Sequence, residues 1–129
     1  MSWVNDTLSE FGRQIGLDNL DFGVHGVAQL VFQSGAVLAV EPVSRGELDE
    51  VLVYVSRPTG FEGLRLLRRA LVKAHFKKAG ALDVQVATRG QGPDMALLGL
   101  VRIPAREFTL QTLDNTFDYL NRWHDSLSV

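Results

Sequence analysis

The sequence predicts a single α+β domain, in which an antiparallel sheet is packed with helices. Three observations carry this prediction. The 129 residues include 46% apolar and 22% charged residues, a balance typical of one soluble domain. Three segments have apolar residues at helical spacing, and five have the alternating or continuous apolar pattern of strands. Short polar turns join most consecutive strands. The predicted order over residues 1–129 is therefore α-β-β-β-α-β-β-α.

The first predicted helix begins at Ser2, whose hydroxyl can cap it, and ends near Gly16. The apolar positions of this helix recur every three or four residues and are Val4, Leu8, Phe11 and Ile15. Polar residues flank this stripe, so one face of the helix must be covered by the domain or by a partner.

Three strands are predicted next, at residues 27–32, 36–40 and 50–56. The first two are separated by Gln33, Ser34 and Gly35, which is typical of a hairpin. The polar segment 43–49 is expected to be a turn between the second and third strands.

A helix over 61–80 interrupts the strands, and two further strands are predicted at 82–88 and 95–103. The Gly- and Pro-rich segment 89–94 is expected to join them as a hairpin turn. Pro104 follows the last strand, and a final helix has the apolar positions Leu110, Leu113, Phe117, Leu120 and Leu127, with Trp123 beside that stripe.

The helix over 61–80 concentrates the positive charge of the chain. Six of the 13 Lys and Arg residues lie in it against one acid, Glu62, whereas the flanking parts of the chain are acidic. Its apolar residues spread around much of its girth, so we expect one side to pack on the sheet and another to meet a second subunit. The alternative is a helix that packs on one side and exposes a solvated basic face.

No set of residues in the sequence is typical of catalysis. The three histidines, His25, His75 and His124, have no metal-ligand spacing. His124, Asp125 and Ser126 are adjacent, but neighbouring side chains diverge on a helix, so we expect a surface helix end and no triad. We predict no catalytic residue, no metal site and no cofactor.

Composition also bears on location and partners. Cysteine is absent, and no segment has the roughly 20 apolar residues of a membrane span. The N-terminus has acids where a signal peptide needs a basic start, so we expect a cytoplasmic protein without membrane association. The net charge of −2 argues against general nucleic-acid binding.

The element order, the size and the opening of the chain resemble the small class I chaperones of type III secretion, the CesT-like or Tir-chaperone family. The segment MSWVNDTLSEFGRQIGL is similar to the start of SycN-type members, which begin with MSW and an amphipathic helix that ends in a Gly-Leu or Gly-Val pair. The similarity continues through Gln33 to Gly35 and through Lys73 to Leu82, and it covers most of the chain.

This resemblance implies a non-catalytic, ATP-independent chaperone that keeps the N-terminal region of a secreted effector or gatekeeper protein partly extended and targets it for export. It also implies a dimer, either a homodimer or a heterodimer with a second small chaperone. The residues implied to line the substrate groove are Val4, Leu8, Phe11, Phe22, Val24 and Phe32. The residues implied to make the dimer interface are Leu64, Leu67, Leu71, Ala74, His75 and Val84. For each groove residue, ordinary core packing is the alternative.

Two other classes of function stay open from the sequence. A small regulatory protein could use its basic helix to bind nucleic acid, although aromatic residues for base stacking do not interleave with the charges. A small enzyme has no residue spacing in its favour and ranks last. The sequence leaves open which secreted protein is bound and whether the dimer is homomeric or heteromeric.

Overall fold

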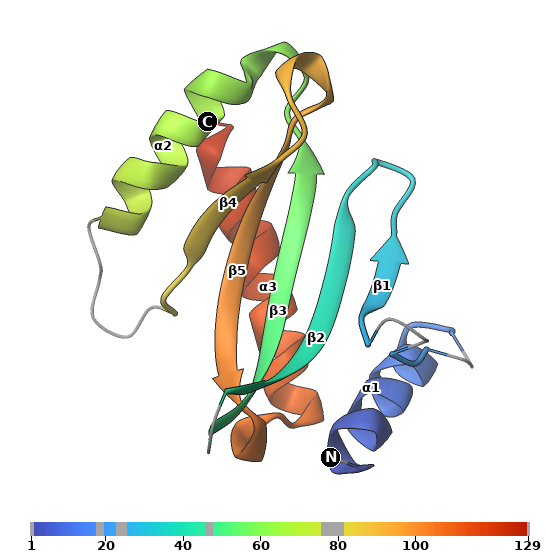
Figure 1. Ribbon diagram of the computed structural model, residues 1–129. Coiled ribbons are helices and arrows are strands. Elements are labelled where there is room, and N and C mark those ends of the chain that lie inside the picture. The colour runs from blue at the N-terminus through green and yellow to red at the C-terminus, as the bar shows by residue number, and fades with distance from the viewer. Residues whose placement is uncertain (1, 18–19, 23–25, 46–47, 76–81, 129) are drawn as a thin grey trace.

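The computed structural model describes residues 2–17, 20–22, 26–45, 48–75 and 82–128. Within these residues, three helices and five strands follow the predicted order, and short 3₁₀ turns precede α2, β5 and α3 (Figure 1). The elements are α1 (Ser2–Gln14), β1 (Ala28–Val31), β2 (Val37–Arg45), β3 (Leu48–Pro58), α2 (Gly63–His75), β4 (Gln85–Arg89), β5 (Ala96–Pro104) and α3 (Leu110–Leu127). The predicted α+β fold class is confirmed.

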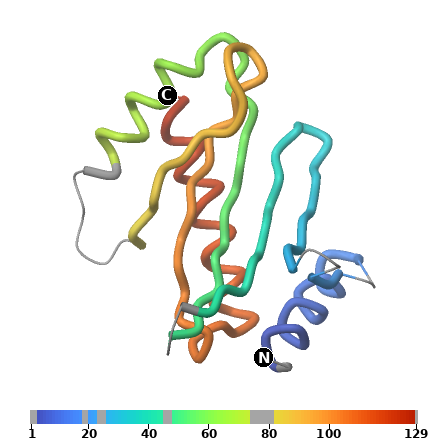
Figure 2. The backbone as a smooth tube through the Cα atoms, viewed as in Figure 1, coloured from blue at the N-terminus to red at the C-terminus, as the bar shows by residue number. Residues whose placement is uncertain are grey.

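The five strands form one antiparallel sheet in the order β1-β2-β3-β5-β4. The central strand is β3, whose Val53 pairs with Val40 of β2 on one side and with Val101 of β5 on the other. Helix α3 packs on β3 and β5. Helix α1 lies at the opposite end of the domain from α2, and it contacts α3 (Figure 2). Helix α2 contacts β4, β5 and the C-terminal part of α3. Strands β1 and β4 are therefore the two edges of the sheet.

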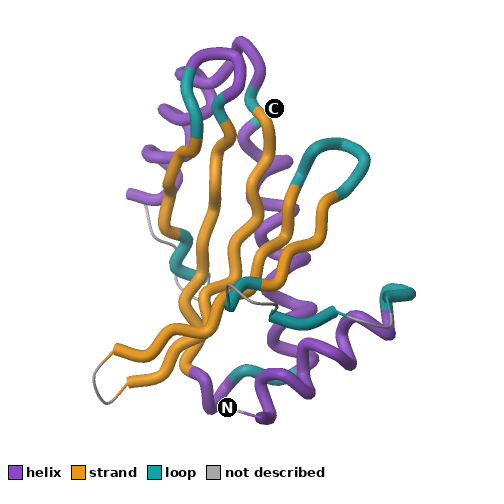
Figure 3. The backbone as a smooth tube through the Cα atoms, turned by 45° about the vertical axis from the view of Figure 1, so that its right-hand side comes forward, coloured by secondary structure: helices purple, strands orange, loops and turns teal. Residues whose placement is uncertain are grey.

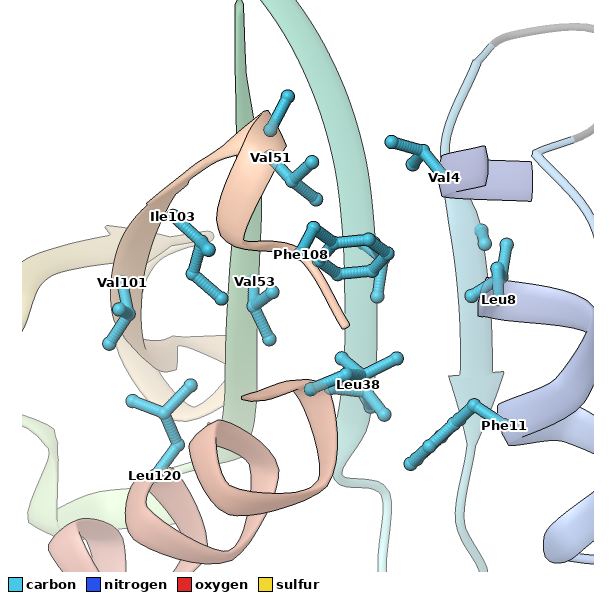
Figure 4. Close-up of a cluster of buried hydrophobic side chains, with 14 of the residues drawn as sticks. Val4, Leu8, Phe11, Leu38, Val51, Val53, Val101, Ile103, Phe108 and Leu120 are labelled. Carbon is cyan, nitrogen blue, oxygen red and sulfur yellow. The ribbon is translucent and has the colours of Figure 1, made fainter. Parts of the chain in front are cut away.

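The main core lies between the sheet, α1 and α3. Side chains from all three layers meet there, including Phe11, Leu38, Val53, Phe108 and Leu120 (Figure 4). A second cluster joins α2 to the sheet and to the end of α3, and its buried members are Ala70, Leu97, Trp123 and Leu127. The two clusters hold all three helices on the sheet, because burial of such side chains is the main favourable contribution to folding.

Two local expectations are wrong. The segment 43–49, expected to be a turn, belongs largely to β2 and β3, which pair as far as Arg45 and Leu48. Figure 3 shows this hairpin projecting beyond the other strands. Ile15 does not extend the buried stripe of the first helix, because α1 ends at Gln14 and Ile15 is 45% exposed. The predicted end of the second helix, residues 76–80, lies outside the described residues.

Candidate protein-interaction surfaces

The three groove residues expected on the first helix lie in the core. Val4, Leu8 and Phe11 are each 1% exposed, and their side chains point from α1 toward the sheet and Phe108 (Figure 4). Phe11 also meets the ring of Phe117 on α3 edge to face, with 6.2 Å between the ring centroids. These positions agree with the core-packing alternative, because no surface remains on the three side chains for a bound protein.

The other expected groove residues are divided. Phe22 is partly buried against the same core, and Val24 lies outside the described residues. Phe32 is 39% exposed, and its ring stacks on Phe117 with a centroid distance of 5.9 Å and an interplanar angle of 12°. Among the expected groove residues that the structure describes, Phe32 is the one with substantial exposed surface.

Phe32 borders a cavity of about 490 Å³ between the β1–β2 turn, the end of β3 and α3. The residues that line it are Phe32, Ser34, Ala36, Arg57, Pro58, Phe117 and Asn121. Arg57 crosses from β3 to α3: its Nη1 donates to Asp125 Oδ1 at 2.7 Å, and its Nη2 donates to the backbone and side-chain oxygens of Asn121, each at 3.2 Å. The cavity therefore combines an aromatic wall with a guanidinium group.

Strand β1 presents an open edge beside this cavity. Among the described strands, it pairs with β2 on one side and ends the sheet on the other. Ala28 faces the core, whereas Gln29 and Val31 face solvent, and Val31 is 74% exposed. An unpaired strand edge offers backbone donors and acceptors in a row, which an extended peptide can use.

The outer face of α2 is a second apolar surface. Phe61, just before the helix, is 96% exposed, and Leu64, Leu71 and Val72 are 63%, 52% and 58% exposed. Of the other residues expected at a dimer interface, Leu67 on α2 is partly buried against the second core cluster, and Val84 is partly buried against both core clusters. The side chains of Ala74 and His75 lie outside the described part of the chain.

Three of the four described basic residues of α2 have local partners, and Arg68 is the fourth. Arg65 pairs with Glu62 at 2.9 Å, Arg69 Nη1 donates to the Leu127 carbonyl oxygen at 2.8 Å, and Lys73 Nζ donates to the Ser126 hydroxyl. Cations are favourable at the carbonyl end of a helix, so Arg69 and Lys73 fix α2 against the C-terminal end of α3. Part of the positive charge thus has a structural role.

The expectation of a surface position for His124 is wrong. The residue is 4% exposed, and its Nε2 lies 2.8 Å from the carbonyl oxygen of Val55 on β3. Burial lowers the pKa of His124, although its hydrogen bond to Val55 acts in the opposite direction. The neighbouring Asp125 and Ser126 contact Arg57 and Lys73, so the three side chains diverge and form no triad.

Tyr54 lies on the opposite face of β3 from the core valines. Burial and the nearby Glu41 raise the pKa of Tyr54, and Arg89 opposes them.

Among the described residues, no group of three or more His, Cys, Asp or Glu side chains could hold a metal ion. None of the described helices combines the length and the apolar character needed to cross a membrane.

The sequence did not indicate Arg57 and Asn121 as site residues. In the sequence, Arg57 directly follows the strand predicted at 50–56, and Asn121 lies in the last predicted helix outside its apolar stripe. Their contact spans 64 positions of the chain, so no local pattern contains it. The spacing of Phe117 did indicate a buried helix face, but not its stack with Phe32.

Comparison with solved structures defines the class of fold. The chain is similar to the Yersinia pestis type III secretion chaperone SycH, solved in complex with a stable fragment of YscM2, with 15% identity, a TM-score of 0.69, and 96% of this chain and 98% of that chain covered. It is also similar to a chain of the ExsC–ExsE complex, with 22% identity, a TM-score of 0.71, and 95% of this chain and 89% of that chain covered. For a chain of the HopA1–SchA chaperone–effector complex, the identity is 17% and the TM-score is 0.64, and 95% of this chain and 90% of that chain are covered.

These likenesses show that the fold is that of the type III secretion chaperones. The sequence narrows the class: residues 3–128 match the family described as type III secretory system chaperone SycN, so the chain belongs to that family. No curated protein is significantly similar to the chain in sequence.

Proposed function

We propose that this chaperone binds an extended segment of one secreted protein, an effector or a gatekeeper, along the open edge of β1, and that it does so without ATP and without catalysis. The observation that carries the proposal is the outer edge of β1, which pairs with no described strand other than β2. Val31 at its end is exposed, and the next residue, Phe32, lines the cavity. Each of the three similar structures is a complex of two different proteins, which supports a stoichiometric protein partner.

Binding at such an edge needs no reactive group. A peptide strand added to β1 makes main-chain hydrogen bonds, and every second side chain packs against the face that Gln29 and Val31 present. The bound segment stays extended because the edge of a sheet accepts only an extended chain. A partner kept in this form in the cytoplasm would be ready for export.

A dimer through α2 completes the proposal. Phe61, Leu64, Leu71 and Val72 form an apolar surface on the side of α2 that the domain leaves uncovered. Exposed apolar side chains gathered on one helix face are typical of an interaction site. The second subunit can be the same chain or a second small chaperone.

The test is affinity capture of the tagged chain from cells that carry its secretion apparatus, after nuclease treatment and at moderate salt. We expect one secreted protein to be retained at a fixed stoichiometry. Val31→Asp should remove it, because the charge lies where the added strand would pack. Leu48→Asp is the matched control, since Leu48 is 65% exposed at the far end of the β2–β3 hairpin. The proposal would be contradicted if no protein were retained after nuclease treatment while an untreated sample retained nucleic acid.

A further inference from the structure

The cavity beside β1 has the size and the composition of a side-chain pocket. Its volume of about 490 Å³ lies within the range of roughly 300–1,000 Å³ that is common for ligand sites. Four of its residues supply apolar surface: Phe32, Ala36, Pro58 and Phe117. The other three, Ser34, Arg57 and Asn121, are polar, and none of the lining residues is acidic.

The apolar wall favours an aromatic occupant. Phe32 and Phe117 lie nearly parallel, so together they present a rigid aromatic surface whose outer member is 39% exposed. An exposed aromatic ring held in place by a second ring loses little freedom when another ring packs against it. A large apolar side chain would therefore cover surface that is now in contact with water.

The polar wall favours a carboxylate beside that side chain. The guanidinium of Arg57 is held in one orientation by Asn121 and Asp125, and the Arg57 side chain is 31% exposed. Its internal carboxylate partner is weakly held, because the side chain of Asp125 is 68% exposed. Arginine binds carboxylates through paired hydrogen bonds, so an incoming Asp or Glu can share or replace Asp125 at this position.

The cavity also continues the open edge of β1. Phe32 directly follows Val31, the last residue of the strand, and its backbone amide donates to Ala36 across the turn. A segment running along β1 would thus reach the cavity as it leaves the strand. From these observations we infer that the cavity is a specificity pocket that selects an aromatic side chain adjacent to Asp or Glu in the bound protein. This inference rests on the proposed function, since it names the peptide chemistry that the edge would accept.

The test uses synthetic peptides, so it does not depend on the identity of the secreted partner. The full ¹⁵N-labelled chain is titrated with capped Gly-Trp-Asp-Gly, and with capped Gly-Trp-Asn-Gly and Gly-Ala-Asp-Gly as matched controls. We expect saturable amide shifts at Ser34, Ala36 and Asn121 with the first peptide, and at least threefold weaker binding of both controls. Equal binding of the Asp and Asn peptides, or shifts confined to other parts of the chain, would overturn the pocket assignment.

Three variants sharpen the test. Phe32→Ala should weaken the binding of Gly-Trp-Asp-Gly at least threefold. Leu48→Ala, at an apolar residue that is 65% exposed at the far end of the β2–β3 hairpin, should leave its affinity unchanged. Asp125→Asn should strengthen binding of the Asp peptide about two- to fivefold, because it removes a surface ion pair that competes for Arg57. A gain in affinity cannot come from misfolding, and a loss or no change with Asp125→Asn would overturn the role of Arg57. Peptide binding without capture of any secreted protein would contradict the proposed function while leaving the pocket intact.

Discussion

The Nε2 atom of His124 lies 2.8 Å from the carbonyl oxygen of Val55 and joins the last helix to the central strand. A carbonyl oxygen can only accept a hydrogen bond, so Nε2 carries the hydrogen and donates it. Burial of the side chain and the nearby Arg57 disfavour the charged imidazolium, whereas the bond to Val55 and the carboxylate of Asp125 favour it, and burial has the largest effect on the pKa. The structure thus stabilises the neutral imidazole.

This environment predicts lower stability in mild acid. Because burial lowers the pKa of His124 below its ordinary value of about 6.5, the unfolded chain binds a proton there before the folded chain does. The contribution to stability is complete above about pH 6.5 and is lost as the pH falls through the folded pKa. Denaturant unfolding between pH 8 and 5 should show this decline, and His124→Gln should reduce the slope. Equal slopes for both proteins would show that His124 is not the responsible group.

Because Phe11 is buried, we expect its replacement to destabilise the fold, and not only to weaken partner binding. Phe11→Ala should lower the free energy of unfolding by about 3–5 kcal/mol, the usual cost of removing a buried aromatic ring. Leu17→Ala, at a residue that is 40% exposed, should cost far less and serves as the control. If the Phe11→Ala protein keeps wild-type stability but no longer captures its partner, Phe11 belongs to the substrate groove and not to the core.

Gly99 on β5 allows Trp123 to approach the sheet. A Cβ atom placed at Gly99 would lie 2.8 Å from Cζ3 of the Trp123 ring, which is closer than normal van der Waals contact. Gly99→Ala should therefore cost about 1–3 kcal/mol of unfolding free energy. In the Trp123→Phe background the same change should cost less, because the contacting ring atoms are absent. Additive effects in this double-mutant cycle would contradict the close contact as the cause.

The exposed face of α2 predicts a charge-sensitive dimer. Leu64→Asp should shift the mass in light scattering from twice 14.3 kDa, or from that of a heterodimer, toward 14.3 kDa. The circular dichroism spectrum should not change, because Leu64 is 63% exposed. Leu48→Asp, at nearly the same exposure of 65% but on the β2–β3 hairpin, should leave the mass unchanged. An unchanged mass for Leu64→Asp would place the interface elsewhere.

The order of elements could be predicted from the sequence because helices and strands have different apolar periods, and Gly and Pro residues separate them. Even the first helix ends close to the expected Gly16. The turn expected at 43–49 was wrong because the polar residues there are strand residues: β2 and β3 pair with each other beyond the core, where a strand can be polar.

The site could be predicted only in part. The apolar stripe of the first helix is the same whether its own domain or a partner covers it, so Val4, Leu8 and Phe11 could not be assigned from spacing. Phe32 differs because it follows a short edge strand, but its exposure depends on the stack with Phe117, 85 positions later. His124 was misplaced for the same reason: its partner, Val55, is 69 positions away.

The most direct test of the chaperone function is to delete the gene for this chain in its own cell and compare the proteins exported by the type III apparatus. We expect one protein, or a small set, to fall in the secreted fraction, and we expect the wild-type chain to restore it while Val31→Asp does not. If every exported protein remains at its normal level after the deletion, the chain does not serve secretion as a chaperone.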